Sequence, residues 1–200
     1  MSQADFLLAN NAVYVEKGEV PTVNLAKISG QKGDNLEDIF PRHAVVTCMD
    51  PRIDPLRALG LEGKAAMIRN AGGVGVDALR SLIVFQEFTH AREIAVVHHT
   101  DCGMLYVSSD KIHAGPKNVP QDMQFHEFSN LEDGVRRDVH WLQERVKDGA
   151  LLEGTHVVGY LLENETGKVS VRQSQFATYQ PVDDACPSFA WSSDHPPSGQ

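Results

Sequence analysis

The stretch EIAVVHHTDCG, residues 93–103, begins as a short apolar run and ends in side chains of the kind that bind metals. The stretch HAVVTCMDPR, residues 43–52, is built in the same way. A short apolar run bounded by polar turn residues is typical of a strand buried on both faces. Such strands belong to parallel sheets that are covered by helices. The two stretches therefore predict parallel strands with reactive side chains at their carboxyl ends.

Three more runs of this kind predict further strands of the same sheet. They lie at residues 65–68, 155–162 and 168–172, and the last follows a turn at residues 164–167. Helical patterns fall between the strands, and strands that alternate with helices are typical of an α/β fold. We therefore expect a mainly parallel β-sheet flanked by helices, with an antiparallel edge strand.

Two short helices are predicted, one from composition and one from the signals at its ends. Residues 5–16 have the composition of a short helix. Asp54 is a good N-cap, Pro55 fits the first helical position, and Gly60 is suited to end that helix.

The two longer helices also carry start signals. Asp77 is placed to cap a helix over residues 78–88. Ser129 and Glu132 have capping-box spacing before a one-sided apolar stripe, which Gly149 ends.

Domain organisation follows from composition along the chain. Residues 1–180 are expected to form a single domain, with a polar surface connection at residues 18–38. Residues 181–200 are rich in Pro and Ser and lack apolar periodicity, which predicts a C-terminal tail. Cys186 and Trp191 lie in this tail, and we assign them no chemistry.

Charge and cysteine content exclude several classes of function. The 200 residues include 27 acidic and 18 basic residues, a net charge of −9, which disfavours nucleic-acid binding. No window approaches 18 apolar residues, so no membrane span is expected. Three cysteines without a signal-peptide pattern argue for reduced thiols and a cytoplasmic location.

Cys48, His99 and Cys102 are the candidate metal ligands. Cys48 follows one predicted strand, and His99 and Cys102 follow another. Ligands of open parallel sheets bind outside the carboxyl ends of the strands, so these side chains meet there if the strands are neighbours. Two thiolates and an imidazole suit Zn²⁺ and leave one tetrahedral position open. We expect one zinc ion per chain.

Asp50 and Arg52 lie close to this predicted site. Pro51 favours an extended conformation at Asp50, which would put its side chain on the same side as Cys48. Asp50 could then ligate the metal or accept a hydrogen bond from the water that the metal activates. Because Arg52 can form a fork with the carboxylate, it favours the second role.

Two neighbours of the predicted ligands have other readings. Strand alternation sends His98 to the opposite side from His99, so His98 is expected to be a hydrogen-bonded residue beneath the sheet. Asp101 could accept a hydrogen bond from a ligating histidine or could cap a helix. The glycines at residues 72–75 lack the spacing of a nucleotide-binding loop and indicate a tight turn.

At the level of motifs, the chain resembles the β-class carbonic anhydrases. The resemblance rests on CMDPR (48–52), IRNAGG (68–73), DALRSL (77–82) and HHTDCGM (98–104). It is specific over about residues 40–110 and continues less distinctively to about residue 175, whereas residues 106–128 lie outside it. It implies zinc binding by the residues named above and a catalytic dyad of Asp50 and Arg52.

The resemblance also implies an assembly and a choice of substrates. It implies a homodimer or a dimer of dimers in which the N-terminal helix, residues 5–16, packs on the partner. Reversible hydration of CO2 to bicarbonate is the first expectation. The short branch of the family that this chain most resembles includes carbonyl sulfide hydrolases, so hydrolysis of carbonyl sulfide is the alternative. A non-catalytic zinc-binding protein and a thiol redox protein using Cys48 and Cys102 are more remote alternatives.

Overall fold

The computed structural model describes residues 3–18 and 42–172. Its strands are β1 (His43–Cys48), β2 (Ala65–Asn70), β3 (Glu93–His99), β4 (His156–Leu162) and β5 (Val169–Val171). Its helices are α1 (Gln3–Glu16), α4 (Pro55–Leu59), α5 (Gly75–Thr89), α6 (Ser109–His113) and α7 (Leu131–Lys147), with a 3₁₀ helix, η1 (Gly103–Tyr106).

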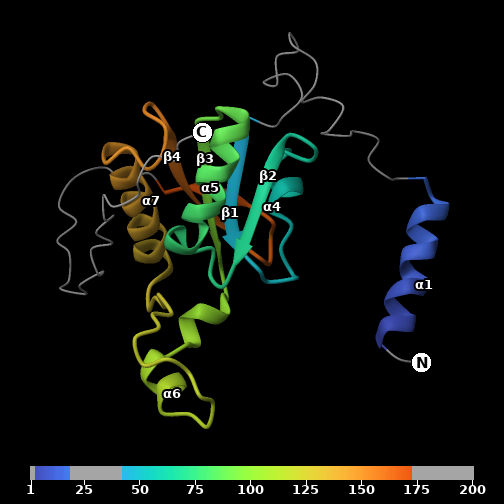
Figure 1. Cartoon of the computed structure of the whole chain (residues 1–200), viewed down its shortest axis with the longest axis horizontal. Helices are drawn as coiled ribbons and strands as arrows, with labels where there is room; N and C mark the ends of the chain where they lie inside the picture. Colours follow the sequence, from blue (N-terminus) through green and yellow to red (C-terminus); the bar gives the residue numbers. More distant parts are fainter. Residues whose placement is uncertain (1–2, 19–41, 173–200) are drawn as a thin grey trace, which may run out of the picture.

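The five strands form one sheet in the order β2-β1-β3-β4-β5, shown in Figure 1. The first four are parallel, and β5 pairs antiparallel with β4. Within the register, Cys48 lies opposite Asn70, and Thr47 lies opposite Val97. The predicted α/β fold is confirmed, and the carboxyl ends of β1, β2 and β3 lie at one edge of the sheet.

Two apolar clusters enclose the sheet. The first joins the strands to α5 and α7 through fully buried side chains such as Leu82 and Leu142. The second gathers Val45 and Val97 with partly buried side chains of α4, and it includes Cys48 and Cys102. The sheet is therefore packed on both sides, and the two cysteines belong to one of its cores.

The ends of α4 are as predicted, whereas the starts of the two longer helices differ. The Asp54 side chain accepts a hydrogen bond from the backbone amide of Arg57, and Gly60 ends α4 in the left-handed conformation. Helix α5 begins at Gly75, so Asp77 lies within its first turn and is not its cap. In α7 the cap is Asn130 rather than Ser129, because the Asn130 side-chain oxygen accepts hydrogen bonds from the free backbone amides of the first turn.

Between β3 and α7 the chain forms two short helices that were not predicted. These are η1 and α6, and Figure 1 shows α6 projecting beyond the strand ends. The Glu127 carboxylate accepts hydrogen bonds from the amide and the hydroxyl of Ser109 at the start of α6. Local polar contacts thus order this excursion.

Several predictions fall outside the described residues. The domain boundary at residue 180, the tail at residues 181–200 with Cys186, and almost all of the polar connection are among them. The N-terminal helix is present as α1. None of the helices in the described residues has the length and apolar content needed to cross a bilayer.

Gly73 lets the turn after β2 approach the end of β1. It has a φ of 75°, and a Cβ added there would lie 2.8 Å from the Thr47 carbonyl carbon and 2.9 Å from the Cys48 nitrogen. Neither backbone atom can move without displacing the strand. The tight turn predicted at the glycines is therefore confirmed, and it fixes the β2–α5 connection against Cys48.

We expect Gly73→Ala to destabilise the protein strongly, because it adds both a positive-φ penalty and a backbone clash. The matched control is Gly149→Ala, which has a φ of 83° and open space around the added Cβ. Urea denaturation should give a loss of about 1 kcal/mol for the control. The loss for Gly73→Ala should be larger by at least about 2 kcal/mol. Equal losses in the two variants would contradict the close approach.

Candidate metal centre

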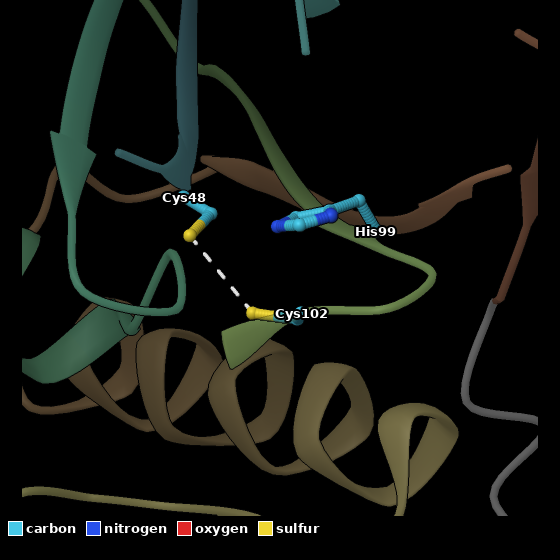
Figure 2. Close-up of side chains that lie close together, drawn as sticks. All are labelled: Cys48, His99 and Cys102. Atoms are coloured by element: carbon cyan, nitrogen blue, oxygen red, sulfur yellow. Dashed lines mark hydrogen bonds between the residues drawn. The ribbon is translucent and has the colours of Figure 1, made fainter. Parts of the chain in front are cut away.

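Cys48, His99 and Cys102 come together at the carboxyl edge of the sheet. One donor atom from each lies within 4.8 Å of the other two. The sulfurs of Cys48 and Cys102 are 3.9 Å apart, and Figure 2 shows the three side chains turned toward one another. Their side chains are buried. The structure thus gathers the three predicted ligands into one compact, shielded cluster that could hold a metal ion.

The imidazole of His99 is oriented for a ligand at Nε2. Its Nδ1 lies 2.9 Å from the Thr100 carbonyl oxygen, which can only accept, so Nδ1 carries the proton. Its Nε2 is buried and has no hydrogen-bond partner. A buried nitrogen with an unused lone pair is costly unless something binds it. The donor set therefore fits a metal such as zinc.

The two thiols share one favourable negative charge. Cys102 donates a hydrogen bond to the sulfur of Cys48, and this bond lowers the pKa of Cys48, aided by the backbone amides of Asp50 and Gly72. The same pairing raises the pKa of Cys102. Burial disfavours the charged form of His99, but the proximity and the negative charge of Cys48 outweigh it and raise the pKa of His99. A cation that binds here would displace protons from these groups into solvent.

Asp50 and Arg52 form the predicted pair beside the cluster. Arg52 Nε and Nη2 donate to the Asp50 carboxylate at 3.0 and 2.7 Å, and the Arg52 amide donates to the same carboxylate at 2.9 Å. These bonds hold the pKa of Asp50 well below its usual range. Asp50 Oδ2 also lies 3.8 Å from His99 Nε2. The carboxylate therefore stays ionised and close to the atoms that would hold a metal.

Arg69 contacts the loop that carries Cys48 and Asp50, although the sequence analysis gave it no role. Its Nε donates to the Cys48 carbonyl oxygen at 2.9 Å, and its Nη2 donates to the Asp50 carbonyl oxygen. Arg69 therefore holds the backbone of the loop that carries both side chains. Arg69 lies in β2 directly opposite Thr47, and this register, which only the folded sheet sets, makes the contact possible.

The structure resolves the two neighbours that had more than one reading. His98 lies on the other side of the sheet, stacked on Phe128, with Nε2 at 3.1 Å from Asp138 Oδ2. The expected separation of His98 from His99 is confirmed. Asp101 neither accepts a hydrogen bond from His99 nor caps a helix. Its carboxylate instead accepts a hydrogen bond from Arg52 Nη1 at 2.7 Å.

Known proteins resemble this chain in sequence and in fold. No protein-family model matches the chain. The β-carbonic anhydrase 1 of Mycobacterium tuberculosis is 42% identical over 173 residues, covering 85% of this chain and 98% of that protein. The chain belongs to the β-carbonic anhydrase family. The crystal structure of carbonic anhydrase from Streptococcus mutans agrees with this membership, with a TM-score of 0.69, 30% identity, and coverage of 86% of this chain and 99% of that one.

A second kind of enzyme in the family matches a shorter part. The carbon disulfide hydrolase of Saccharolobus solfataricus is 43% identical over 70 residues, which is 34% of each chain. The sequence match to a β-carbonic anhydrase thus spans most of the chain, whereas the sequence match to the hydrolase is confined to one part.

The loop contacts of Arg69 lead to a test of metal affinity. We expect Arg69→Lys to weaken Zn²⁺ binding about tenfold, because a single ammonium group cannot replace the rigid fork on two carbonyl oxygens. Competition with a chromophoric chelator would measure the affinity. Arg80→Lys, at an exposed position on α5, is the matched control and should bind like the wild type. Equal affinities in all three proteins would show that Arg69 does not support the site.

Proposed function

We propose that the chain is a zinc enzyme that catalyses the reversible hydration of CO2 to bicarbonate. Cys48, His99 and Cys102 would hold one Zn²⁺ per chain. The observation that carries the proposal is the unpartnered Nε2 of His99 facing two buried sulfurs, with the Asp50–Arg52 pair alongside. The near-full-length similarity to a β-carbonic anhydrase supports the choice of reaction.

Zinc, when bound, supplies Lewis-acid activation of water and so a nucleophile near neutral pH. Asp50 would accept a hydrogen bond from the attacking water. This bond would point a lone pair of the water oxygen at the substrate carbon. Arg52 keeps Asp50 ionised and in place through the bonds described above. With Arg52 on both carboxylate oxygens, Asp50 would act on the water, while Cys48, His99 and Cys102 would hold the metal.

The surroundings suit a small apolar gas. Cys48 and Cys102 belong to the same apolar cluster as Val97 and Met104, so the site lies against a dry core. CO2 carries no charge and binds weakly to water-filled sites, whereas a dry wall strengthens the polar contacts that act on it.

Hydrolysis of carbonyl sulfide to CO2 and H2S is the alternative reaction. It would use the same five residues, since attack on its carbon gives a thiocarbonate that collapses to CO2 and sulfide. The partial match to a carbon disulfide hydrolase favours keeping this alternative. The reduced thiols of the site suit a cytoplasmic location, which we include in the proposal.

Parallel assays on one zinc-loaded sample separate these reactions. We expect CO2 hydration to dominate, measured by stopped-flow proton release, with little sulfide released from carbonyl sulfide. Cys48→Ser should abolish turnover and lower the zinc content, whereas Cys186→Ser, the matched control, should change neither.

The opposite ratio of rates would replace CO2 by carbonyl sulfide as the main substrate. Zinc present without turnover of either gas would make the chain a non-catalytic zinc-binding protein. Thiol redox activity in metal-free protein would favour a redox protein instead.

We further propose that the chain forms a homodimer, or a dimer of dimers, through α1. In the single chain this helix exposes large apolar side chains, including Leu8 at 68% and Val15 at 56%. Exposed apolar side chains on a helix favour burial against another surface. A partner chain is the surface that the family resemblance implies.

Sedimentation velocity tests this assembly. We expect the wild type to sediment as a dimer or tetramer and the double variant Leu8→Glu/Val15→Glu to shift toward monomer, because each added charge would be buried at the interface. Asn10→Glu, at an exposed polar position on the opposite face of the same helix, should leave the assembly unchanged. A double variant that sediments like the wild type would exclude α1 from the interface.

A further inference from the structure

Asp101 has a backbone conformation that is uncommon for residues other than glycine. Its φ is 52°, in the left-handed region, where a side chain with a Cβ costs about 1 kcal/mol or more. It lies between His99 and Cys102, in the loop that carries two of the proposed ligands. A strained residue at such a place indicates that its contacts have a functional use.

The strained conformation lets Asp101 hold Arg52 with two different groups. Its carboxylate Oδ2 accepts from Arg52 Nη1 at 2.7 Å, and its carbonyl oxygen accepts from Arg52 Nη2 at 2.8 Å. The Tyr106 hydroxyl lies 3.4 Å from the other carboxylate oxygen. Arg52 is thus held on one side by the loop at residues 99–102, here called the metal loop, and on the other side by Asp50.

This bridge decides how firmly Arg52 can control Asp50. The Arg52 and Asp101 side chains are 52% and 53% exposed. Because Arg52 is half exposed, pairing with the largely buried Asp50 alone would leave the rest of the guanidinium to solvent, which weakens the restraint on this long side chain. Two carboxylates and a carbonyl oxygen on one guanidinium define its position far better. Among the described residues, the Arg52 side chain donates its hydrogen bonds to Asp50 and Asp101 alone.

The position of Asp50 matters because it has two possible partners. Its Oδ2 is 3.8 Å from the unpartnered Nε2 of His99, so a small movement would bring the carboxylate onto a metal held there. That movement requires the Asp50–Arg52 hydrogen bonds to break or Arg52 to follow. Arg52 cannot follow while Asp101 holds it.

We propose that Asp101 is a positioning residue that, through Arg52, keeps Asp50 off the metal and leaves the fourth coordination position open. The inference rests on the proposed function in so far as it assumes a metal at Cys48, His99 and Cys102. It concerns a residue that contacts neither substrate nor metal.

Asp101→Gly is the most direct variant, because glycine accepts the positive φ and keeps the carbonyl contact while removing only the carboxylate. Asp101→Asn is the conservative variant, since its side-chain oxygen can still accept from Arg52 Nη1. His90→Gly is the matched control: it relieves another non-glycine positive φ, at 51°, at the end of α5.

The readouts are azide binding to the cobalt-loaded proteins, followed by the visible spectrum of Co²⁺, and CO2 hydration by the zinc-loaded proteins. In Asp101→Gly we expect full metal content, about tenfold weaker azide binding, and about tenfold lower kcat, because Asp50 competes for the open position. Asp101→Asn should recover much of both losses, and His90→Gly should match the wild type.

Unchanged azide affinity and kcat in Asp101→Gly would overturn the inference. Loss of metal from both Asp101 variants would also overturn it, because Asp101 would then support the metal loop itself. If the wild type binds Co²⁺ and azide but does not hydrate CO2, the proposed function fails. The azide titrations of the Asp101 variants would still decide this inference.

Discussion

The parallel pairing of β1 with β3 is the constraint on which the site depends. It sets Thr47 opposite Val97, and the Thr47 hydroxyl donates to the Val97 carbonyl oxygen at 2.8 Å. With this register, Cys48 and His99 leave the sheet at the same edge. A shift of one residue would exchange the faces of β3 and turn His98 toward the cysteines. The buried register of the sheet thus selects which of two adjacent histidines joins the sulfurs.

Sequence reasoning predicted the features that follow from periodicity and missed those that depend on long-range contacts. The strands, the opposite sides of His98 and His99, and the pairing of Asp50 with Arg52 all follow from local rules, and the structure confirms them. The prediction of Ser129 as the cap of α7 was wrong, because Ser129 and Asn130 can both cap a helix and only the folded backbone selects Asn130. The contacts of Arg69 and Asp101 join segments far apart in the chain, and no local pattern signals them.

Electrostatics explains why arginines surround a site of acidic and thiol groups. The chain has a net charge of −9, and Asp50 and Asp101 lie beside two thiols. Arg52 bridges both carboxylates, while Arg69 binds the backbone carbonyl oxygens of the same loop. Each guanidinium joins elements as well as offsetting charge. In the proposed reaction these residues would act in the same way on either linear substrate, so they do not decide between CO2 and carbonyl sulfide.

The central claim is that two sulfurs and one imidazole nitrogen hold one zinc ion and leave one position to solvent. X-ray absorption at the zinc edge of the wild-type protein tests it most directly, since the method counts sulfur neighbours. The account predicts two sulfurs at about 2.3 Å and two nitrogen or oxygen atoms at about 2.0–2.1 Å. A shell of three or more sulfurs, or one without sulfur, would contradict it.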